Sequence, residues 1–320
     1  MASNPTLSVV IPVFNEHKVL PEFYQRTSAA LRSIKTSYEL VFIDDGSRDN
    51  SVEILTDFAK KDPAIVIIKF SRNFGHQAAI SAGMANAKGD AVVIIDSDCQ
   101  DPPEVIPELF ASWKQGFEVV YTKRKKRKGE FFLLQFFAKI FYRLLGTFSA
   151  VKIPRDTGDF RLIDRKVCDV LSSMGEYHKY IRGLVAWTGF RQKEVSYVRK
   201  KRAAGKSTYG FFQRVRLAVN ALTSFSPKPL KLASMIGLVT FFGGLVYLGY
   251  ALYQFFFTTD TVPGWTSTIA LLIILNGISY LLLGIMGEYI GRIFEEVKKR
   301  PLYIIDSIQQ PGKKQKKRGK

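Results

Sequence analysis

The sequence predicts an α/β domain with a mainly parallel sheet, joined to interfacial helices and a two-helix transmembrane hairpin. Strand-like Val/Ile runs alternate with helical segments over residues 7–103. Two long apolar stretches, 232–257 and 266–288, follow later in the chain, and the formal net charge is +19. With 47% apolar and 23% charged residues the composition is that of a globular protein, which excludes wholesale disorder.

Four strands are expected, and each runs into a polar turn. They lie at 7–16, 38–47, 64–75 and 90–103. Helical spacing between them predicts helices at 17–34, 47–61 and 76–89, and Asp49 or Asn50 suits the N-cap of the second helix. Uninterrupted Val/Ile runs of this kind are typical of a parallel sheet that helices cover on both faces.

The polar turns predict a ligand site, because open parallel sheets bind ligands beyond the carboxyl ends of their strands. All four predicted strands end in acids or amides. These residues are Asn15, Glu16, Asp44, Asp45, Asn73, Asp96 and Asp98. Four strands that deliver such groups to one edge of a sheet indicate a binding site rather than ordinary surface polarity.

The segment IIDSDCQDPP gives the most specific indication of chemistry. Side chains two apart on an extended segment point the same way, so Asp96 and Asp98 are expected to face one small volume. Two carboxylates repel unless a cation lies beside them, and Mg²⁺ or Mn²⁺ prefers such oxygen ligands. Gln100 can add an amide oxygen. The alternative interpretation is that these acids only cap a helix from a loop.

Each apolar stretch, 232–257 and 266–288, is long enough to cross a bilayer as a helix. The short segment between them lacks Lys and Arg, whereas basic residues flank the pair on both outer sides. The positive-inside rule therefore predicts a hairpin over 229–290 with both termini in the cytoplasm. Two buried helices of a soluble protein are the alternative. Only two cysteines and no recognisable signal peptide fit the same cytoplasm-facing compartment.

Three basic clusters, 123–128, 199–202 and 313–320, suggest contact with an anionic membrane surface. Residues 130–146 follow the first cluster and have the pattern of a helix lying in the membrane interface, although a core helix is the alternative. A second, juxtamembrane helix is expected at 211–228. The membrane-proximal position favours lipid over nucleic acid as the partner of these clusters.

Several motifs together resemble the family 2 glycosyltransferases, and within them the polyprenyl-phosphate glycosyltransferases. They are PVFNE (12–16), DDGS (44–47), RNFGHQAAISAG (72–83), DSDCQDPP (96–103) and TGDFRL (157–162). The resemblance implies a GT-A fold over 1–210, a nucleotide-sugar donor, a divalent metal, and transfer with inversion to a polyprenyl phosphate at the cytoplasmic membrane face. The paired apolar stretches and RPLYII (300–305) match the membrane-anchored bacterial members, which suggests UDP-glucose as donor.

The resemblance also implies roles for individual residues. Pro12, Phe14, Glu16 and Asp45 would hold the nucleobase and ribose. Asp96, Ser97 and Asp98 would meet the diphosphate through the metal, with Gln100 as a further ligand. Arg124 and Arg202 would neutralise the donor phosphates. The family often has Tyr at position 14, so Phe14 keeps the stacking face and lacks the hydroxyl.

Asp159, in TGDFRL, is the candidate base at the acceptor. A lipid monophosphate has a second pKa near about 6 and is already mostly deprotonated at neutral pH, so Asp159 is expected to orient the acceptor and take any residual proton. A carboxylate paired with Arg161 is the alternative. His76 is interpreted as a helix-start residue and Cys99 as a packing residue.

Other readings remain open from the sequence. A processive polysaccharide synthase would share the donor site, but no Q-x-x-R-W motif accompanies the three tryptophans. A membrane-tethered nucleic-acid-binding protein would explain the charge but not the acidic strand ends. An inactive scaffold is disfavoured by the intact motifs.

Residues 291–320 are expected to form a β segment and a basic tail, the segment pairing with the soluble domain of its own or a neighbouring subunit. That favours a homo-oligomer, for which family likeness suggests a tetramer. The sugar itself stays open, with mannose, galactose and aminoarabinose as alternatives to glucose.

Overall fold

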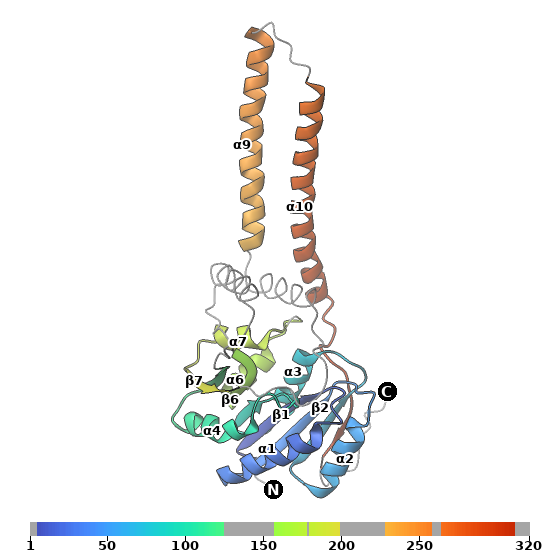
Figure 1. Ribbon diagram of the computed structural model, residues 1–320, viewed down its shortest axis with the longest axis vertical. Coiled ribbons are helices and arrows are strands. Elements are labelled where there is room, and N and C mark those ends of the chain that lie inside the picture. The colour runs from blue at the N-terminus through green and yellow to red at the C-terminus, as the bar shows by residue number, and fades with distance from the viewer. Residues whose placement is uncertain (1–4, 125–156, 178, 199–227, 258–263, 311–320) are drawn as a thin grey trace. The chain divides into compact units, whose positions relative to one another are not determined.

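The computed structural model describes residues 5–124, 157–177, 179–198, 228–257 and 264–310. They form two units (Figure 1): an α/β unit that includes the last strand of the chain, and a unit that holds the two long helices. The interfacial helix expected at 130–146 lies outside the described residues. So do nearly all of the juxtamembrane helix expected at 211–228, residue Arg202, and the tail from 311.

The α/β unit is built on one eight-stranded sheet with the order β7-β5-β6-β4-β1-β2-β3-β8. The strands are β1 (Leu7–Val13), β2 (Tyr38–Asp44), β3 (Ile65–Phe70), β4 (Ala91–Ile94), β5 (Val119–Arg124), β6 (Thr157–Asp164), β7 (Gln192–Tyr197) and β8 (Ile305–Gln309). The four strands predicted from the sequence, β1 to β4, are adjacent and parallel to one another. Of the later strands, β6 and β8 pair antiparallel to their neighbours, while β5 and β7 are parallel to each other. The mostly parallel α/β sheet is therefore confirmed.

Helices cover both faces of this sheet (Figure 1). They are α1 (Leu20–Ile34), α2 (Ser51–Lys61), α3 (His76–Asn86), α4 (Ile106–Lys114), α6 (Arg165–Ser173) and α7 (Ile181–Trp187), with a 3₁₀ turn at Pro103–Val105. α1, α2 and α4 lie on one side of the sheet, and α3, α6 and α7 on the other. Asn50 precedes α2, but Asp49 supplies the capping contact, since its Oδ1 accepts from the Ser51 N–H at 3.1 Å.

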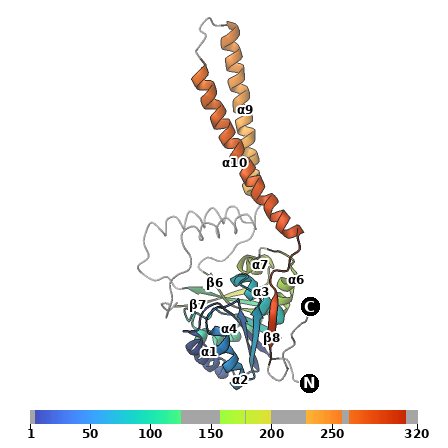
Figure 2. The ribbon, with the colours of Figure 1, turned by 90° about the vertical axis from the view of Figure 1, so that its right-hand side faces the viewer.

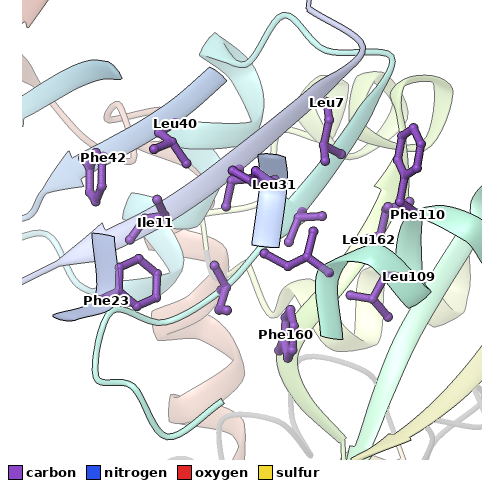
Figure 3. Close-up of a cluster of buried hydrophobic side chains, with 14 of the residues drawn as sticks. Leu7, Ile11, Phe23, Leu31, Leu40, Phe42, Leu109, Phe110, Phe160 and Leu162 are labelled. Carbon is purple, nitrogen blue, oxygen red and sulfur yellow. The ribbon is translucent and has the colours of Figure 1, made fainter. Parts of the chain in front are cut away.

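The side chains of β1 alternate between the two faces of the sheet, and helices pack on both faces. Val9 and Ile11 belong to the hydrophobic cluster that Leu20, Phe23 and Leu31 of α1 complete (Figure 3). Val10 points to the opposite face, where α3 packs so closely that Gly83 has no room for a side chain. A strand that is buried on both sides must be apolar at every position, and all seven residues of β1 are buried.

The C-terminal strand β8 completes the sheet of its own chain. It pairs antiparallel with β3, and the Ser71 N–H donates to the Ile304 carbonyl at 3.1 Å just before the strand begins. Tyr303 stacks on Phe70 with ring centroids 5.2 Å apart. The β segment expected in this region is thus present, and its pairing here needs no neighbouring subunit. A homo-oligomer stays a prediction.

The second unit holds two long helices, α9 (Lys228–Phe257) and α10 (Trp265–Val297), which lie side by side (Figures 1 and 2). Many of their large apolar side chains are exposed, including Val246, Tyr280 and Ile290. Among the described residues, one helical segment, Ile274–Val297, is long and apolar enough to cross a membrane, and Met235–Tyr250 is a shorter apolar helix. Two helices therefore stand where the hairpin was expected, while the crossing of the membrane by both stays a prediction.

Candidate active site

Hydrogen bonds between the turns hold the carboxyl ends of β1, β2 and β4 together. Asn15, with a left-handed φ of 55°, accepts at its Oδ1 from the Arg48 N–H at 2.8 Å. The Glu16 N–H donates to Ser51 Oγ at 3.0 Å, and Ser97 Oγ donates to the Pro12 carbonyl at 3.0 Å. Strained turn residues of this kind are often found at functional sites. Pro12, Glu16 and Ser97, which the sequence predicted to bind the nucleotide-sugar donor, thus lie along the same edge of the sheet.

Phe14 and Asp45 differ sharply in exposure. Phe14 is 45% exposed, which leaves its ring accessible to a ligand. Asp45 is buried, and its carboxylate accepts from the Phe74 N–H at 2.7 Å and from the Gly75 N–H at 3.0 Å. Burial raises the pKa of Asp45, although the two backbone hydrogen bonds oppose that rise. The carboxylate therefore holds the turn that leads into α3, a structural role that the sequence did not indicate.

The D-x-D segment has the alternation expected of it. Asp96, Asp98 and Gln100 are partly exposed, whereas Ser97 and Cys99 between them are buried. Cys99 has a φ of 57°, and the Gln100 N–H donates to Asp98 Oδ1 at 3.1 Å, so the segment turns tightly after Asp98. Burial raises the pKa of the Cys99 thiol to about 11, which keeps it protonated and agrees with a packing role.

The carboxylate oxygens of Asp96 and Asp98 fit a Mg²⁺ or Mn²⁺ ion that also binds phosphate and water. Both side chains offer hard carboxylate oxygens, which these ions prefer. Within the described ranges, no three His, Cys, Asp or Glu side chains are grouped so as to hold an ion by themselves. Mg²⁺ is usually held by one or two carboxylates together with substrate phosphates. The residues therefore suit an ion shared with a diphosphate and do not form a closed cage.

His76, the first residue of α3, lies between the D-x-D segment and Asp159. Its Nε2 is 2.8 Å from Asp96 Oδ1, and its Nδ1 is 3.9 Å from Asp159 Oδ2. Burial lowers the pKa of the imidazole, but the contacts with Asp96 and then Asp159 outweigh burial and raise the pKa to about 9. His76 is thus a cation at neutral pH that joins the two acids. The interpretation of His76 as a helix-start residue was correct in position and missed this bridging contact.

Asp159 lies on β6 rather than in a loop, and its side chain is only 10% exposed. Its Oδ1 forms an ion pair with Nε of Arg182, on α7, at 3.0 Å. Its Oδ2 accepts from Nε2 of Gln77, on α3, at 3.5 Å. The residues Gln77 and Arg182 belong to helices far from Asp159 in the sequence, so no local pattern could have indicated them.

Arg161 does not pair with Asp159 as the alternative reading required. Its guanidinium is buried, and Nη2 donates to the Gly158 carbonyl at 2.8 Å. Burial lowers the pKa of Arg161 to about 10, an effect that the charge of Asp159 only partly offsets. The pairing of Asp159 with Arg161 is therefore wrong, and Arg182 takes that place.

Of the two predicted phosphate-binding arginines, Arg124 is the last residue of β5, paired in register with Tyr197 of β7. Tyr197 in turn donates a hydrogen bond to Asp101, which follows the D-x-D segment. The end of β5 is thereby tied to the same edge of the sheet. Arg202 lies beyond the described residues.

Comparison with known proteins gives consistent matches along the chain. Residues 8–171 match the model of glycosyl transferase family 2, and residues 228–293 match that of the GtrB C-terminal hairpin. The chain is 49% identical over 95% of its length to an uncharacterized glycosyltransferase of Bacillus subtilis, of which 94% is covered. It is 38% identical over 95% of its length to a prophage bactoprenol glucosyl transferase homolog of Escherichia coli, of which 99% is covered.

A third relative, the bactoprenol glucosyl transferase of Shigella phage SfII, is 38% identical over 93% of this chain and 97% of its own. Among solved structures, mannosyl-3-phosphoglycerate synthase from Rubrobacter xylanophilus matches with a TM-score of 0.48 and 16% identity, covering 69% of this chain and 73% of that one. This structural likeness is too low to bear on function. The sequence matches agree with the GT-A-like α/β fold expected from the motifs.

Proposed function

We propose a reaction for this chain, which belongs to glycosyl transferase family 2 and is a glycosyltransferase: the transfer of one hexose, glucose from UDP-glucose in the first instance, to a polyprenyl phosphate. The transfer inverts the anomeric centre and takes place at the cytoplasmic face of the membrane. The relatives named as bactoprenol glucosyl transferases support the choice of sugar and acceptor, since they align over nearly the whole chain.

One observation carries the proposal: His76 contacts both Asp96 of the D-x-D segment and Asp159. An inverting transfer is a single displacement, in which an acceptor oxygen attacks the anomeric carbon as the bond to the leaving diphosphate breaks on the opposite side. The acceptor group and the leaving group must therefore be held close together, on either side of one sugar ring. A carboxylate at the acceptor and acids at the diphosphate, linked through the ring of His76, suit that geometry.

On the donor side, the chain's residues hold the nucleotide. The exposed ring of Phe14 offers a stacking face for the base, with Pro12 at the end of β1, Glu16 on the turn that follows and Asp45 fixing the neighbouring turn. Arg124 and Arg202 are proposed to neutralise the phosphates. A divalent cation bound by Asp96 and Asp98, with Gln100 nearby, would stabilise the negative charge that develops on the departing diphosphate.

On the acceptor side, Asp159 meets the lipid phosphate. The phosphate oxygen forms the new bond to the anomeric carbon, and any proton it still carries passes to an Asp159 oxygen. α9 and α10 would cross the bilayer as the two spans of a hairpin, with both chain ends in the cytoplasm. The chain would then be held at the membrane that contains the lipid acceptor. The basic clusters support attraction of an anionic head group to this surface.

The purified full chain should be incubated in detergent or nanodiscs with undecaprenyl phosphate, Mn²⁺ and a panel of radiolabelled nucleotide sugars, and the lipid phase extracted. Lipid-linked label from UDP-glucose, with the mass of a single hexose, is the expected result. Asp159→Asn should lower turnover at saturating acceptor by about 10²-fold or more. Asp57→Asn, an exposed carboxylate on α2 paired with Lys60, is the matched control and should not change it.

Absence of lipid-linked label with every donor in the panel would refute the proposal. A polymeric product would favour a processive synthase instead. If Asp159→Asn has the turnover of the wild type, this carboxylate takes no part in the chemical step.

A further inference from the structure

We propose that Gln77 and Arg182 are positioning residues that hold the Asp159 carboxylate in the orientation needed at the acceptor. This inference rests on the proposed function, because it assigns a purpose to contacts made with the candidate base. Neither residue belongs to the sites predicted from the sequence. They come from two helices, α3 and α7, that meet around β6.

The orientation of the Gln77 amide is fixed by its second partner. Its Oε1 accepts from the backbone N–H of Ile181, the first residue of α7, at 3.0 Å. An amide oxygen cannot donate, so the opposite end of the group, the NH₂, must be the end that faces Asp159. Nε2 lies 3.5 Å from Asp159 Oδ2, and Gln77 thereby links α3, α7 and β6.

Arg182 holds the other carboxylate oxygen from α7. Its Nε is 3.0 Å from Asp159 Oδ1, an ion pair without hydrogen-bond geometry, and its Nη1 donates to the carbonyl of Thr157, at the start of β6, at 3.2 Å. The guanidinium also lies over the Tyr180 ring, 5.2 Å from its centroid. Contacts with three groups leave the planar head little freedom, which suits a guanidinium that sets the position of a partner.

Together the two contacts restrict rotation of the carboxylate, because Oδ2 accepts a hydrogen bond from α3 while Oδ1 is in an ion pair with α7. A carboxylate has about four lone-pair positions, so a direction remains for it to accept the residual proton of the acceptor phosphate. Misplacing a reacting group by about 1 Å can cost about 10² in rate. The contribution of Gln77 and Arg182 should therefore appear in turnover, and it should depend on Asp159 being an active carboxylate.

Two conservative substitutions test this in the full chain. Gln77→Glu retains an oxygen for the Ile181 N–H and turns a carboxylate oxygen toward Asp159 in place of the NH₂ donor. Arg182→Lys keeps the positive charge and cannot make both the Nε and Nη1 contacts. Each should lower kcat for transfer to undecaprenyl phosphate by about 10–10²-fold, with smaller changes in the acceptor KM and in the melting temperature.

Matched controls carry the same chemical changes elsewhere on the α/β unit. Gln115→Glu alters an exposed amide that accepts from Lys193, and Arg191→Lys alters an exposed guanidinium near Glu118. Both should leave kcat unchanged. The rise in melting temperature that Mn²⁺ with UDP gives the wild type should be unchanged in Gln77→Glu and Arg182→Lys, because binding of the donor nucleotide does not use the acceptor carboxylate.

The decisive measurement combines Arg182→Lys with Asp159→Asn. If Arg182 acts through Asp159, the double variant loses no more turnover than Asp159→Asn alone. Losses that multiply would show an independent structural effect and would overturn the inference, as would wild-type kcat in both single variants. A wild-type chain that makes no lipid product at all refutes instead the proposed function, and the inference with it.

Discussion

Alanine at Gly83 would place a methyl carbon 2.2 Å from Cγ1 of Val10 and 2.8 Å from Cδ1 of Ile43. Carbon atoms in contact are normally about 3.5–4.0 Å apart. The Ile43 methyl is the end of a flexible side chain and can rotate away. Val10 lies in the buried strand β1, between β2 and β4, so α3 must move outward by roughly 1 Å or more to relieve the clash.

Two opposing effects set the stability of Gly83→Ala. Alanine favours a helix over glycine by about 1 kcal/mol, whereas overpacking a core costs about 1–3 kcal/mol. The packing cost should win, and a net loss of about 1 kcal/mol would lower the melting temperature by about 2–4 °C for a unit of this size. Because α3 begins with His76 and Gln77, the same displacement should lower transfer turnover by about 10-fold or more.

The melting temperature would be followed by intrinsic fluorescence in detergent, and turnover by the lipid-extraction assay. Ala85→Gly is the control, since Ala85 is exposed on the same helix and its replacement removes only helix propensity, about 1 kcal/mol. It should lower the melting temperature and leave turnover unchanged. Wild-type turnover together with an unchanged or raised melting temperature in Gly83→Ala would refute the reasoning.

Three further predictions follow from the site. The pKa of His76 is raised from 6.5 to about 9, because the contacts with Asp96 and Asp159 outweigh the effect of burial. The charge of His76 therefore stabilises the metal-free fold fully below about pH 6.5, and this contribution is lost as the pH rises through about 9. NMR titration of the histidines in chelator should show a midpoint near 9 for His76, and a midpoint near 6.5 would contradict the contact with the two acids. Phe14→Ala should raise the donor KM by about 10-fold or more through lost stacking, without lowering the melting temperature, whereas Phe14→Tyr should retain donor binding. Asp98→Asn should abolish the rise in melting temperature that Mn²⁺ with UDP gives the wild type, and excess chelator should lower turnover by about 10²-fold or more; equal transfer in chelator would exclude a metal role.

The parallel half of the sheet could be predicted from the sequence because its strands are buried on both faces. Such strands must be apolar throughout, and the Val/Ile runs of β1 to β4 show this directly. Strands β5, β6 and β7 lack that signal. β6 mixes polar and apolar residues, TGDFRLID, and was recognised only as a motif. A strand that carries part of the site looks polar in sequence for that reason.

The same distinction holds for the candidate site. Asp96 and Asp98 were predictable because their shared direction follows from local strand geometry. The partners of Asp159 were not, since Gln77 and Arg182 reach it from two helices, α3 and α7, that pack on one face of the sheet. Arg161, the obvious neighbour in sequence, is buried against the backbone of its own strand instead. Contacts between distant segments depend on packing, which no local pattern records.

The pairing of β8 with β3 has a consequence for biosynthesis. Residues 305–309 are translated after α9 and α10, so β3, with the sequence IVIIKF, has no neighbour on that side until both long helices have been made. An unpaired apolar edge of this kind readily joins other chains. This edge of the nascent α/β unit must therefore be protected while α9 and α10 are translated, and addition of β8 is the event that covers it.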